Sequence, residues 1–302
     1  MKIEGIITPI LTPMNSDESV NYDKLEEFVE MQIEGGVHGI FCFGTNGESY
    51  ILSDDEKLKI LEKVVKVTNK RVPVFAGTGQ PGTLHTIELS KKAKGLGVDA
   101  LSIISPFFAA PSQDDIYNHY YRIAKEVDLP IIVYNIPART GTNISPLTIK
   151  RLSEIENIVG VKDSSGNFDN MLQYIEQTRE SNKKRNSDFV VLSGNDSLIL
   201  WCLYAGGAGA ISGVANVYPR NMVSIYENFI KKETDKAKAA QDSIRSFRDV
   251  FKYGNPNTVV KTAVNLLGFD VGPCRSPFNS ISEEGLKQLK TVLEENKNLN
   301  LN

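Results

Sequence analysis

The stretch Asn157–Gly166, NIVGVKDSSG, decides the fold, because it joins a strand-like run to a polar loop through a lysine. Residues 158–161 are apolar and mostly β-branched, which is typical of a parallel strand covered on both faces. Lys162 ends this run, and the residues after it have the composition of a loop. A buried amine is costly unless it is paired or neutral. Lys162 is therefore either held by a carboxylate such as Asp163 or Glu48, or tuned for chemistry.

The same alternation of a short apolar run with an amphipathic stretch continues along most of the chain. The expected strands are EGIITPI (4–10), GIFCFG (39–44), VPVFAG (72–77), ALSIISP (100–106), PIIVYNI (130–136), IVGVKDS (158–164), FVVLSG (189–194) and GAISG (209–213). Between them lie helical patterns, of which residues 53–56, SDDE, open one as a capping box. Eight strand–helix units predict a (β/α)8 TIM barrel, a fold of about 250 residues. An open doubly wound sheet fits less well, since no GxGxxG follows the first strand.

Beyond residue 232 the pattern becomes purely helical, with helices expected over 235–252, 256–267 and 282–296. We therefore divide the chain into a barrel, residues 1–232, and a C-terminal helical extension, residues 233–302, that packs on the barrel. The expected fold class is α/β.

Composition limits the function. A formal charge of −3 over 302 residues gives no basic surface for nucleic acid. The sequence has no run of about 18 apolar residues and no signal-peptide pattern, so no membrane association is expected. Cys42, Cys202 and Cys274 lie far apart and are expected to be reduced thiols of a cytoplasmic protein.

In such barrels the chemistry lies at the carboxyl ends of the strands and in the loops that follow. Those positions hold GTNGE (44–48), YN (134–135) with Arg139, KD (162–163), SGND (193–196) and SG (212–213). None of the three histidines is expected there, which disfavours a His-ligated metal or a Ser-His-Asp triad. Glu48, Asp163 and Asp196 could hold Mg²⁺, but loop carboxylates more often cap helices or pair with bases, so no metal is expected.

Lys162 is the strongest chemical candidate among these residues. Desolvation at the end of an apolar strand disfavours its ammonium form and frees the lone pair for attack on a carbonyl. The resulting imine withdraws electrons, so a carbon–carbon bond one atom away can be made or broken. Tyr134, one strand away, supplies a phenol that can donate and accept protons.

At these residues the chain resembles the dihydrodipicolinate synthase / N-acetylneuraminate lyase family of class I aldolases. The matching stretches, in order, are GTNGES (44–49), SPFFAAPSQ (105–113), YNIPARTG (134–141), GVKDSSGN (160–167) and VLSGND (191–196). The resemblance implies a pyruvate-dependent lyase that needs no cofactor beyond its covalent imine. It also implies a homotetramer assembled as a dimer of dimers.

The resemblance also implies roles for Lys162, for Tyr134 and for the loop after the second strand. Lys162 would form the imine with the keto carbon of pyruvate, Tyr134 would shuttle protons, and Thr45 would bond to the tyrosine hydroxyl. Backbone N–H groups of Thr45 and Asn46, in the loop that begins at Gly44, would hold the pyruvate carboxylate.

Three further positions match the family's binding residues. Gly194 and the carbonyl of Ile211 would line the pyruvate pocket. Arg139 matches an arginine that fixes a carboxylate of the second substrate in the synthases. A surface or interface ion pair is the alternative for Arg139.

Two departures from the synthases bear on the second substrate. Asn46 stands where they usually carry a second threonine, and Phe107-Phe108 where they usually carry two tyrosines. The second tyrosine reaches the neighbouring subunit's proton relay, which Phe108 cannot join, although water or a substrate hydroxyl could substitute. Alternatively, Phe108 serves only interface packing. The positions that match the lysine-inhibition site of some synthases also differ, so feedback by lysine is not expected; they are Asp54, Lys57, Pro81 and His85.

These departures favour aldol cleavage of a 2-keto-3-deoxy sugar acid, or a related 4-hydroxy-2-keto acid, to pyruvate and an aldehyde. The alternative is 4-hydroxy-tetrahydrodipicolinate synthase chemistry, the condensation of pyruvate with aspartate semialdehyde, which Arg139 favours. Sialic acid cleavage fits less well, and a catalytically silent barrel is disfavoured by the presence of lysine, tyrosine and threonine together.

Overall fold

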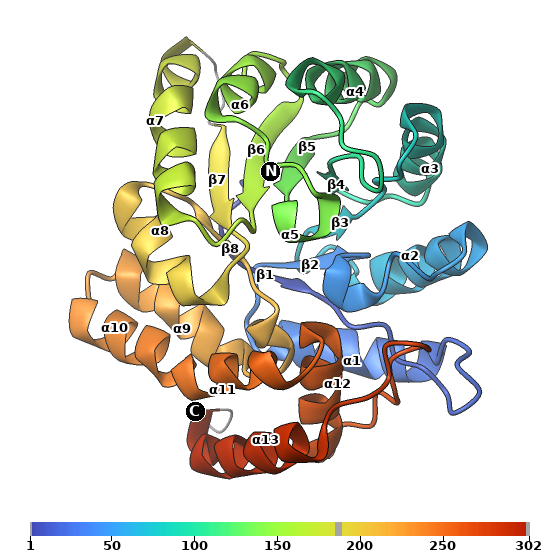
Figure 1. Cartoon of the computed structure of the whole chain (residues 1–302), viewed down its shortest axis with the longest axis vertical. Helices are drawn as coiled ribbons and strands as arrows, with labels where there is room; N and C mark the ends of the chain where they lie inside the picture. The colour runs from blue at the N-terminus through green and yellow to red at the C-terminus, as the bar shows by residue number, and fades with distance from the viewer. Residues whose placement is uncertain (1, 185–188, 300–302) are drawn as a thin grey trace.

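Eight parallel strands close into a barrel in which β1 is hydrogen-bonded to both β2 and β8 (Figure 1). The computed structural model describes residues 2–184 and 189–299. The TIM barrel expected from the sequence is confirmed. The strands are β1 (Gly5–Pro9), β2 (Gly39–Cys42), β3 (Val74–Ala76), β4 (Ala100–Ile104), β5 (Ile131–Asn135), β6 (Ile158–Asp163), β7 (Val190–Ser193) and β8 (Gly209–Ile211).

Helices surround the barrel and follow the strands in sequence order (Figure 1). They are α1 (Tyr22–Glu34), α2 (Asp54–Thr68), α3 (Thr83–Gly95), α4 (Gln113–Glu126), α6 (Pro146–Leu152), α7 (Phe168–Lys184), α8 (Ile199–Ala205) and α9 (Pro219–Ile230). The loops carry the short helix α5 (Pro137–Thr140) and the 3₁₀ turns η1 (Thr45–Gly47), η2 (Asp196–Leu198) and η3 (Val214–Asn216). The expected capping box is confirmed, since Ser53 Oγ accepts from Glu56 N and Ser53 N donates to Glu56 Oε2.

The C-terminal extension lies on one side of the barrel, orange to red in Figure 1. It consists of α10 (Thr234–Ser243), α11 (Arg245–Asp249), η4 (Val250–Tyr253), α12 (Pro256–Leu266), α13 (Glu283–Glu295) and η5 (Lys297–Leu299). A single helix over 235–252 was wrong, because the helix breaks at Ile244. There Ser243 Oγ donates a 2.8 Å hydrogen bond to the Ala240 carbonyl, a local bond of the kind that competes with helical ones.

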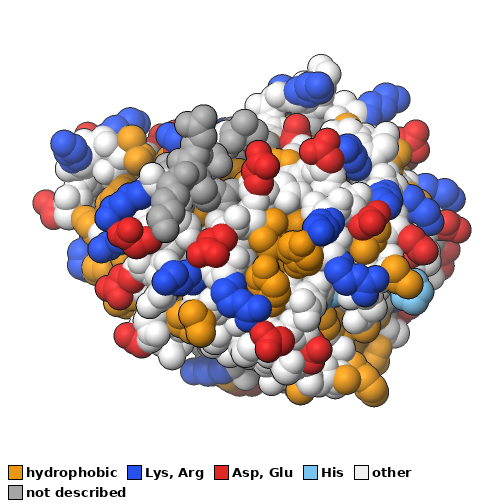
Figure 2. All heavy atoms as spheres, turned by 90° about the horizontal axis from the view of Figure 1, so that it is seen from above, with side chains coloured by type: hydrophobic (Ala, Val, Ile, Leu, Met, Phe, Trp, Pro, Cys, Tyr) orange, Lys and Arg blue, Asp and Glu red, His pale blue; other side chains and the backbone are white. Residues whose placement is uncertain are grey.

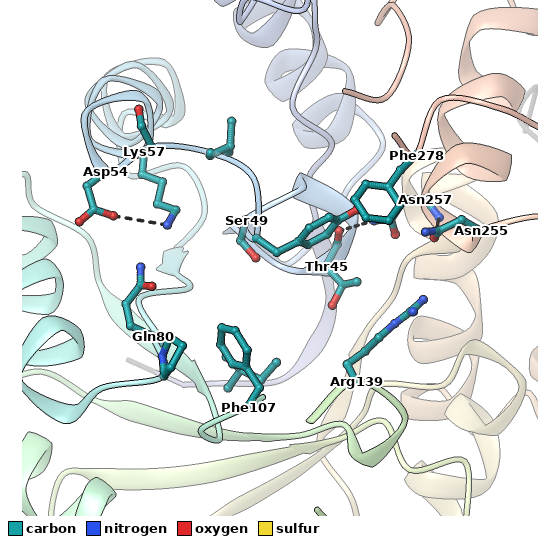
Figure 3. Close-up of a pocket in the computed structure, with 16 residues that line it drawn as sticks. Thr45, Ser49, Asp54, Lys57, Gln80, Phe107, Arg139, Asn255, Asn257 and Phe278 are labelled. Carbon is teal, nitrogen blue, oxygen red and sulfur yellow. Dashed lines mark hydrogen bonds and ion pairs between the residues drawn. The ribbon is translucent and has the colours of Figure 1, made fainter. Parts of the chain in front are cut away.

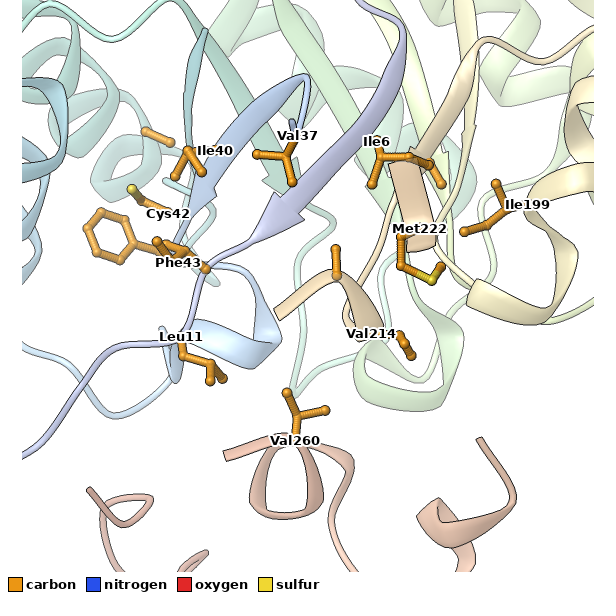
Figure 4. Packing of buried hydrophobic residues seen from close by; sticks show 14 of the residues in the cluster. Ile6, Leu11, Val37, Ile40, Cys42, Phe43, Ile199, Val214, Met222 and Val260 are labelled. Carbon is orange, nitrogen blue, oxygen red and sulfur yellow. The ribbon is translucent and has the colours of Figure 1, made fainter. Parts of the chain in front are cut away.

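The extension shares the main hydrophobic core of the barrel. Val260 of α12 belongs to the same buried cluster as Leu11 and Val214, and Figure 4 shows the three side chains on facing segments. The division at residues 232 and 233 stays a prediction. This shared core supports the interpretation that residues 233–302 pack on the barrel.

A second, smaller cluster fills the barrel interior, with side chains from seven of the eight strands or their immediate ends, and Val159 of β6 packs against it. Its buried members are Ile3, Ile7, Phe41, Phe75, Ala100, Ile132, Leu192 and Ile211. Side chains on a strand alternate between its two faces. Residues two positions beyond Ala100 and Ile132 therefore also point inward, nearer the carboxyl end. Those residues are Ser102 and Tyr134, and Lys162 holds the corresponding place on β6.

The surface mixes charges of both signs. The face in Figure 2 shows Lys and Arg interspersed with Asp and Glu around small hydrophobic groups. No helix within the described ranges is long and apolar enough to cross a membrane.

Candidate active site

Lys162 and Tyr134 lie side by side at the carboxyl end of the barrel. They are paired in register between β5 and β6. Lys162 Nζ lies 3.8 Å from the centroid of the Tyr134 ring and 5.3 Å from that of Phe41. Each of the two paired side chains is only 4% exposed. The amine is thus buried against two aromatic rings at the end of the strand.

The two carboxylates that could have held Lys162 are engaged elsewhere. Asp163 Oδ2 accepts a 2.9 Å hydrogen bond from Ser165 Oγ. Glu48 Oε1 lies 2.6 Å from Lys261 Nζ. Among the described residues no Asp or Glu oxygen lies within 4.0 Å of Lys162. The interpretation of Lys162 as half of an ion pair with Asp163 or Glu48 is therefore wrong.

The Tyr134 hydroxyl sits in a setting that suits proton transfer. Its oxygen lies 3.2 Å from Thr45 Oγ1, and either group can donate. Burial raises the pKa of Tyr134, but the Lys162 charge and hydrogen bonds to Thr45, Lys162 and Ser164 outweigh burial and bring the pKa below its ordinary value. A phenol with a lowered pKa exchanges protons more readily near neutral pH.

Small residues leave room around the lysine. A Cβ at Gly194 would lie 1.9 Å from Ser164 Oγ and 3.0 Å from Lys162 Cε, so a larger residue there would displace these side chains. The Asn46 side chain lies against the loop after β8, since a Cβ on Gly213 would lie 3.2 Å from Asn46 Oδ1. The loop after β7 thus lies against Lys162, and the loop after β2 lies against the loop after β8.

Gly44 and Ile211 complete the predicted set at the barrel end. Gly44 precedes the turn η1, and a Cβ there would lie 2.9 Å from the Phe41 ring. Ile211 ends β8 in register with Ile7 of β1, and its side chain belongs to the interior cluster.

A cleft of about 540 Å³ lies at the mouth of the barrel, and Thr45, Arg139 and Phe107 are among the residues that line it (Figure 3). Arg139 is exposed on α5, and its guanidinium extends toward Asn255 in Figure 3. No carboxylate within 4.0 Å of Arg139 is found in the described part of the chain. The protomer thus leaves this guanidinium free for a ligand or a partner.

The far end of the cleft carries three of the four positions compared with the lysine-inhibition site. Asp54, Lys57 and Pro81 line it, and Lys57 Nζ lies 3.4 Å from Asp54 Oδ1 (Figure 3). His85 is exposed on α3 and does not belong to the lining.

Phe108 is the one predicted residue that stays apart from the site in the protomer. Its side chain is 101% exposed, and its backbone has a φ of 78°, in the left-handed region that phenylalanine seldom adopts. Phe107, in contrast, faces the cleft.

Several residues that hold the site were missed by the sequence analysis. Asn257 Nδ2 donates to the Thr45 carbonyl at 2.6 Å and to the Tyr50 hydroxyl at 3.1 Å. Lys261 pairs with Glu48, and both side chains are at most 1% exposed. These contacts join segments more than 200 residues apart, so no local sequence signal could have found them.

Arg248 of α11 was also missed, and it reaches the loop after β7. It donates to Asn195 Oδ1 at 3.0 Å and to Asp196 Oδ2 at 3.4 Å. Asp196 also accepts a 2.6 Å bond from Ser212 Oγ.

Over residues 2–184 and 189–299 no group of three His, Cys, Asp or Glu side chains could hold a metal ion.

A closed parallel barrel with a buried lysine beside a buried tyrosine at its carboxyl end has the features of a class I aldolase, an enzyme that forms a Schiff base between a lysine and a carbonyl substrate.

The chain belongs to the dihydrodipicolinate synthetase family, whose sequence profile matches residues 2–296. It is a lyase of the class I aldolase type that works through a lysine Schiff base with pyruvate. The 4-hydroxy-tetrahydrodipicolinate synthase of Acetivibrio thermocellus is 37% identical over 291 residues, 96% of each chain.

Crystal structures give the same relationship. Dihydrodipicolinate synthase from Thermotoga maritima matches with a TM-score of 0.93 at 32% identity, over 97% of this chain and 98% of that one. The chloride-inhibited dihydrodipicolinate synthase from Acinetobacter baumannii, in complex with pyruvate, matches with a TM-score of 0.92 at 35% identity, over 97% and 99%.

Proposed function

We propose that this chain is a 4-hydroxy-tetrahydrodipicolinate synthase, which condenses pyruvate with aspartate semialdehyde. The observation that carries the proposal is the buried Lys162 amine against Tyr134. Thr45, the hydrogen-bond partner of Tyr134, also lines the cleft that offers the unpaired Arg139. Similar proteins that cover nearly the whole chain are named as synthases.

In this proposal Lys162 Nζ, as a neutral amine, attacks the keto carbon of pyruvate. The former carbonyl oxygen takes protons through Tyr134 and leaves as water, and a carbon–nitrogen double bond remains. Loss of a proton from the methyl carbon gives an enamine. The enamine attacks the aldehyde carbon of the second substrate, and the protonated imine acts as the electron sink, so we propose no metal or other cofactor.

The pyruvate carboxylate is held, in this proposal, by the N–H groups of Thr45 and Asn46 at the start of η1. The first N–H groups of a helical turn have no partner inside the turn and can bind an anion. Gly194 keeps the space beside Lys162 open, and the Ile211 carbonyl closes the pocket from β8. The free guanidinium of Arg139 suits bidentate pairing with the carboxylate of aspartate semialdehyde.

Sugar-acid cleavage, which the sequence analysis placed first on Asn46 and Phe108, is not the reaction that the comparisons favour. The similar proteins carry the name of the alternative, the synthase. The absence of a phenol at Phe108 does not decide the substrate if another group carries the proton.

The test has two stages. Borohydride added with pyruvate is expected to fix a pyruvate-derived mass on Lys162 and to leave Lys162→Met unlabelled. Label on another residue, or none, would refute the assignment. The wild type is then given pyruvate with aspartate semialdehyde, or 2-keto-3-deoxygluconate alone, and turnover of at least about 1 per second is expected only for the first.

Arg139→Met tests whether Arg139 binds the second substrate and not pyruvate. It is expected to raise KM for aspartate semialdehyde at least tenfold, the effect of losing a charged pair of about 1.4 kcal/mol or more, while pyruvate trapping on Lys162 is unchanged. Turnover of 2-keto-3-deoxygluconate by the wild type would instead restore the sugar-acid interpretation.

We also propose that the enzyme forms a homotetramer and works in the cytoplasm. The exposed aromatic ring of Phe108 supports self-association, and the free, buried thiols of Cys42, Cys202 and Cys274 support a reducing compartment.

A further inference from the structure

A small cavity lies beside Tyr134 at the carboxyl end of the barrel. Its volume is about 20 Å³, and its polar lining residues are Thr45, Ser49, Ser102 and Tyr134. A space of this volume has room for one water molecule but not for a substrate. Because a water needs two to four polar partners, a cavity with four hydroxyl-bearing residues suits it.

Ser102 is the lining residue whose hydroxyl lacks a partner. Its side chain is 1% exposed, and its Oγ has no hydrogen-bond partner among the described residues. On β4 it lies two positions after Ala100, whose side chain belongs to the interior cluster, so Ser102 also points into the barrel. A buried hydroxyl left without a partner costs about 1–3 kcal/mol, so a ligand for Ser102 Oγ is expected.

The cavity adjoins the substrate cleft. Thr45, Ser49, Gly79 and Ile104 line both spaces. Only these shared lining residues separate the cavity from the solvent in the cleft, so a proton can pass between the two over a short distance.

We propose that Ser102 holds a water molecule in this cavity, and that this water is the proton carrier between Thr45–Tyr134 and the cleft. The inference rests on the proposed pyruvate chemistry at Lys162. Ser102 is a positioning residue in this scheme, since it acts through the water and touches no reacting atom.

The proton balance is simple, because only O–H bonds change. When Tyr134 has given up its proton, Thr45 Oγ1, 3.2 Å away, donates its own to the phenolate. The water then donates to Thr45 and takes a proton from solvent in the cleft, and reversal of each step carries a proton outward. The relay lies within one chain, so it does not need the hydroxyl that Phe108 lacks.

The test measures exchange of the pyruvate methyl hydrogens in D₂O by NMR, a half-reaction that needs no second substrate. Ser102→Ala removes the anchor of the water, and we expect exchange and kcat to fall about tenfold or more, with KM for pyruvate within about twofold. Ser105→Ala is the matched control: its Oγ is likewise buried and without a partner in the described chain, on the same segment, but it does not line the cavity.

Equal exchange rates in the two alanine variants would overturn the inference. So would a crystal structure at high resolution with no density within hydrogen-bond distance of Ser102 Oγ and Thr45 Oγ1. If the exchange rates are equal while borohydride still fixes pyruvate on Lys162 in all variants, only the water relay has failed. If the wild type forms no imine, the proposed function has failed as well.

Discussion

The loop after β2, residues 44–53, and the loop after β4, residues 105–112, both border the candidate active site, yet they are held very differently. The first is anchored by buried contacts from the C-terminal extension, whereas the tip of the second carries a fully exposed phenylalanine at a φ of 78°. The C-terminal extension thus fixes the first loop within the protomer, whereas no contact of the described protomer covers the Phe108 ring at the tip of the second, which we call the free loop.

The anchored loop has polar contacts along its length. Lys261 Nζ pairs with Glu48 Oε1 at 2.6 Å, and the backbone N–H of Arg275 donates to Glu48 Oε2 at 2.8 Å. Asn257 donates to the Thr45 carbonyl at 2.6 Å. Because Glu48 and Lys261 are both nearly fully buried, neither group can exchange its partner for water.

The largest expected effect comes from breaking this anchor. Lys261→Met leaves the Glu48 carboxylate buried without its cation, so we expect the free energy of unfolding to fall by about 3–5 kcal/mol in urea denaturation. The control is Lys297→Met, which breaks an equally short 2.6 Å pair with Glu294 on an exposed surface and should cost less than about 1 kcal/mol. Similar losses in both variants would mean that the anchor is no stronger than a surface ion pair.

Acid should weaken the side of the free loop first. His119 of α4, the helix after that loop, is 4% exposed, and its Nδ1 lies 2.9 Å from Thr83 Oγ1. Burial, with a smaller contribution from the Arg122 charge, lowers the pKa of His119 to about 4 from 6.5. The fold thus favours the neutral ring, so its stability contribution is complete above about pH 6.5 and is lost as the pH falls toward about 4.

Urea denaturation of the wild type between pH 7 and pH 4.5 should show most of this loss, about 2–3 kcal/mol; the full loss of about 3 kcal/mol is reached only below about pH 4, where the folded ring is protonated as well. His119→Gln should reduce the slope of stability against pH by about one proton. At the anchored loop, the hydrogen bond from Arg275 lowers the pKa of Glu56 to about 2, so the stability that Glu56 contributes is lost only below about pH 4.5. An unchanged slope of stability against pH in His119→Gln would contradict the expectation that protonation of His119 is the first source of acid destabilisation.

The sequence could predict the barrel and the central pair because both depend on local patterns. A strand end at Lys162 and another at Tyr134 place the two side chains at the same rim of a closed sheet, and register then makes them neighbours. The contacts of Asn257, Lys261 and Arg248 depend instead on where the extension docks, and the cavity at Ser102 depends on side-chain packing. The periodicity of the sequence predicts neither the docking of the extension nor this packing, and it did not predict the helix break at Ile244.

A smaller effect is expected from the bond between Asn257 and Thr45. Asn257→Ala leaves a carbonyl of the η1 turn without its donor, which should lower the free energy of unfolding by about 1–2 kcal/mol. Because Thr45 Oγ1 would then be less well placed against Tyr134, kcat should fall more than the affinity for pyruvate. Asn279→Ala, which removes an exposed 3.1 Å bond to Ser276, is the control and should stay within about 0.5 kcal/mol. If the two substitutions had equal effects on stability and kcat, Asn257 would not support the active site.

The smallest effect on folding is expected at Phe108. Phe108→Ala keeps a side chain that is strained at a φ of 78°, so the change isolates the loss of the ring. Since the ring is fully exposed in the protomer, the free energy of unfolding of the dissociated chain should change by less than about 0.5 kcal/mol. Sedimentation velocity should nevertheless show weaker self-association, whereas Leu147→Ala, another exposed apolar residue at 64%, should leave it unchanged. If Phe108→Ala destabilised the single chain and left its association intact, the free loop would belong to the fold of the protomer, and the contrast with the anchored loop would disappear.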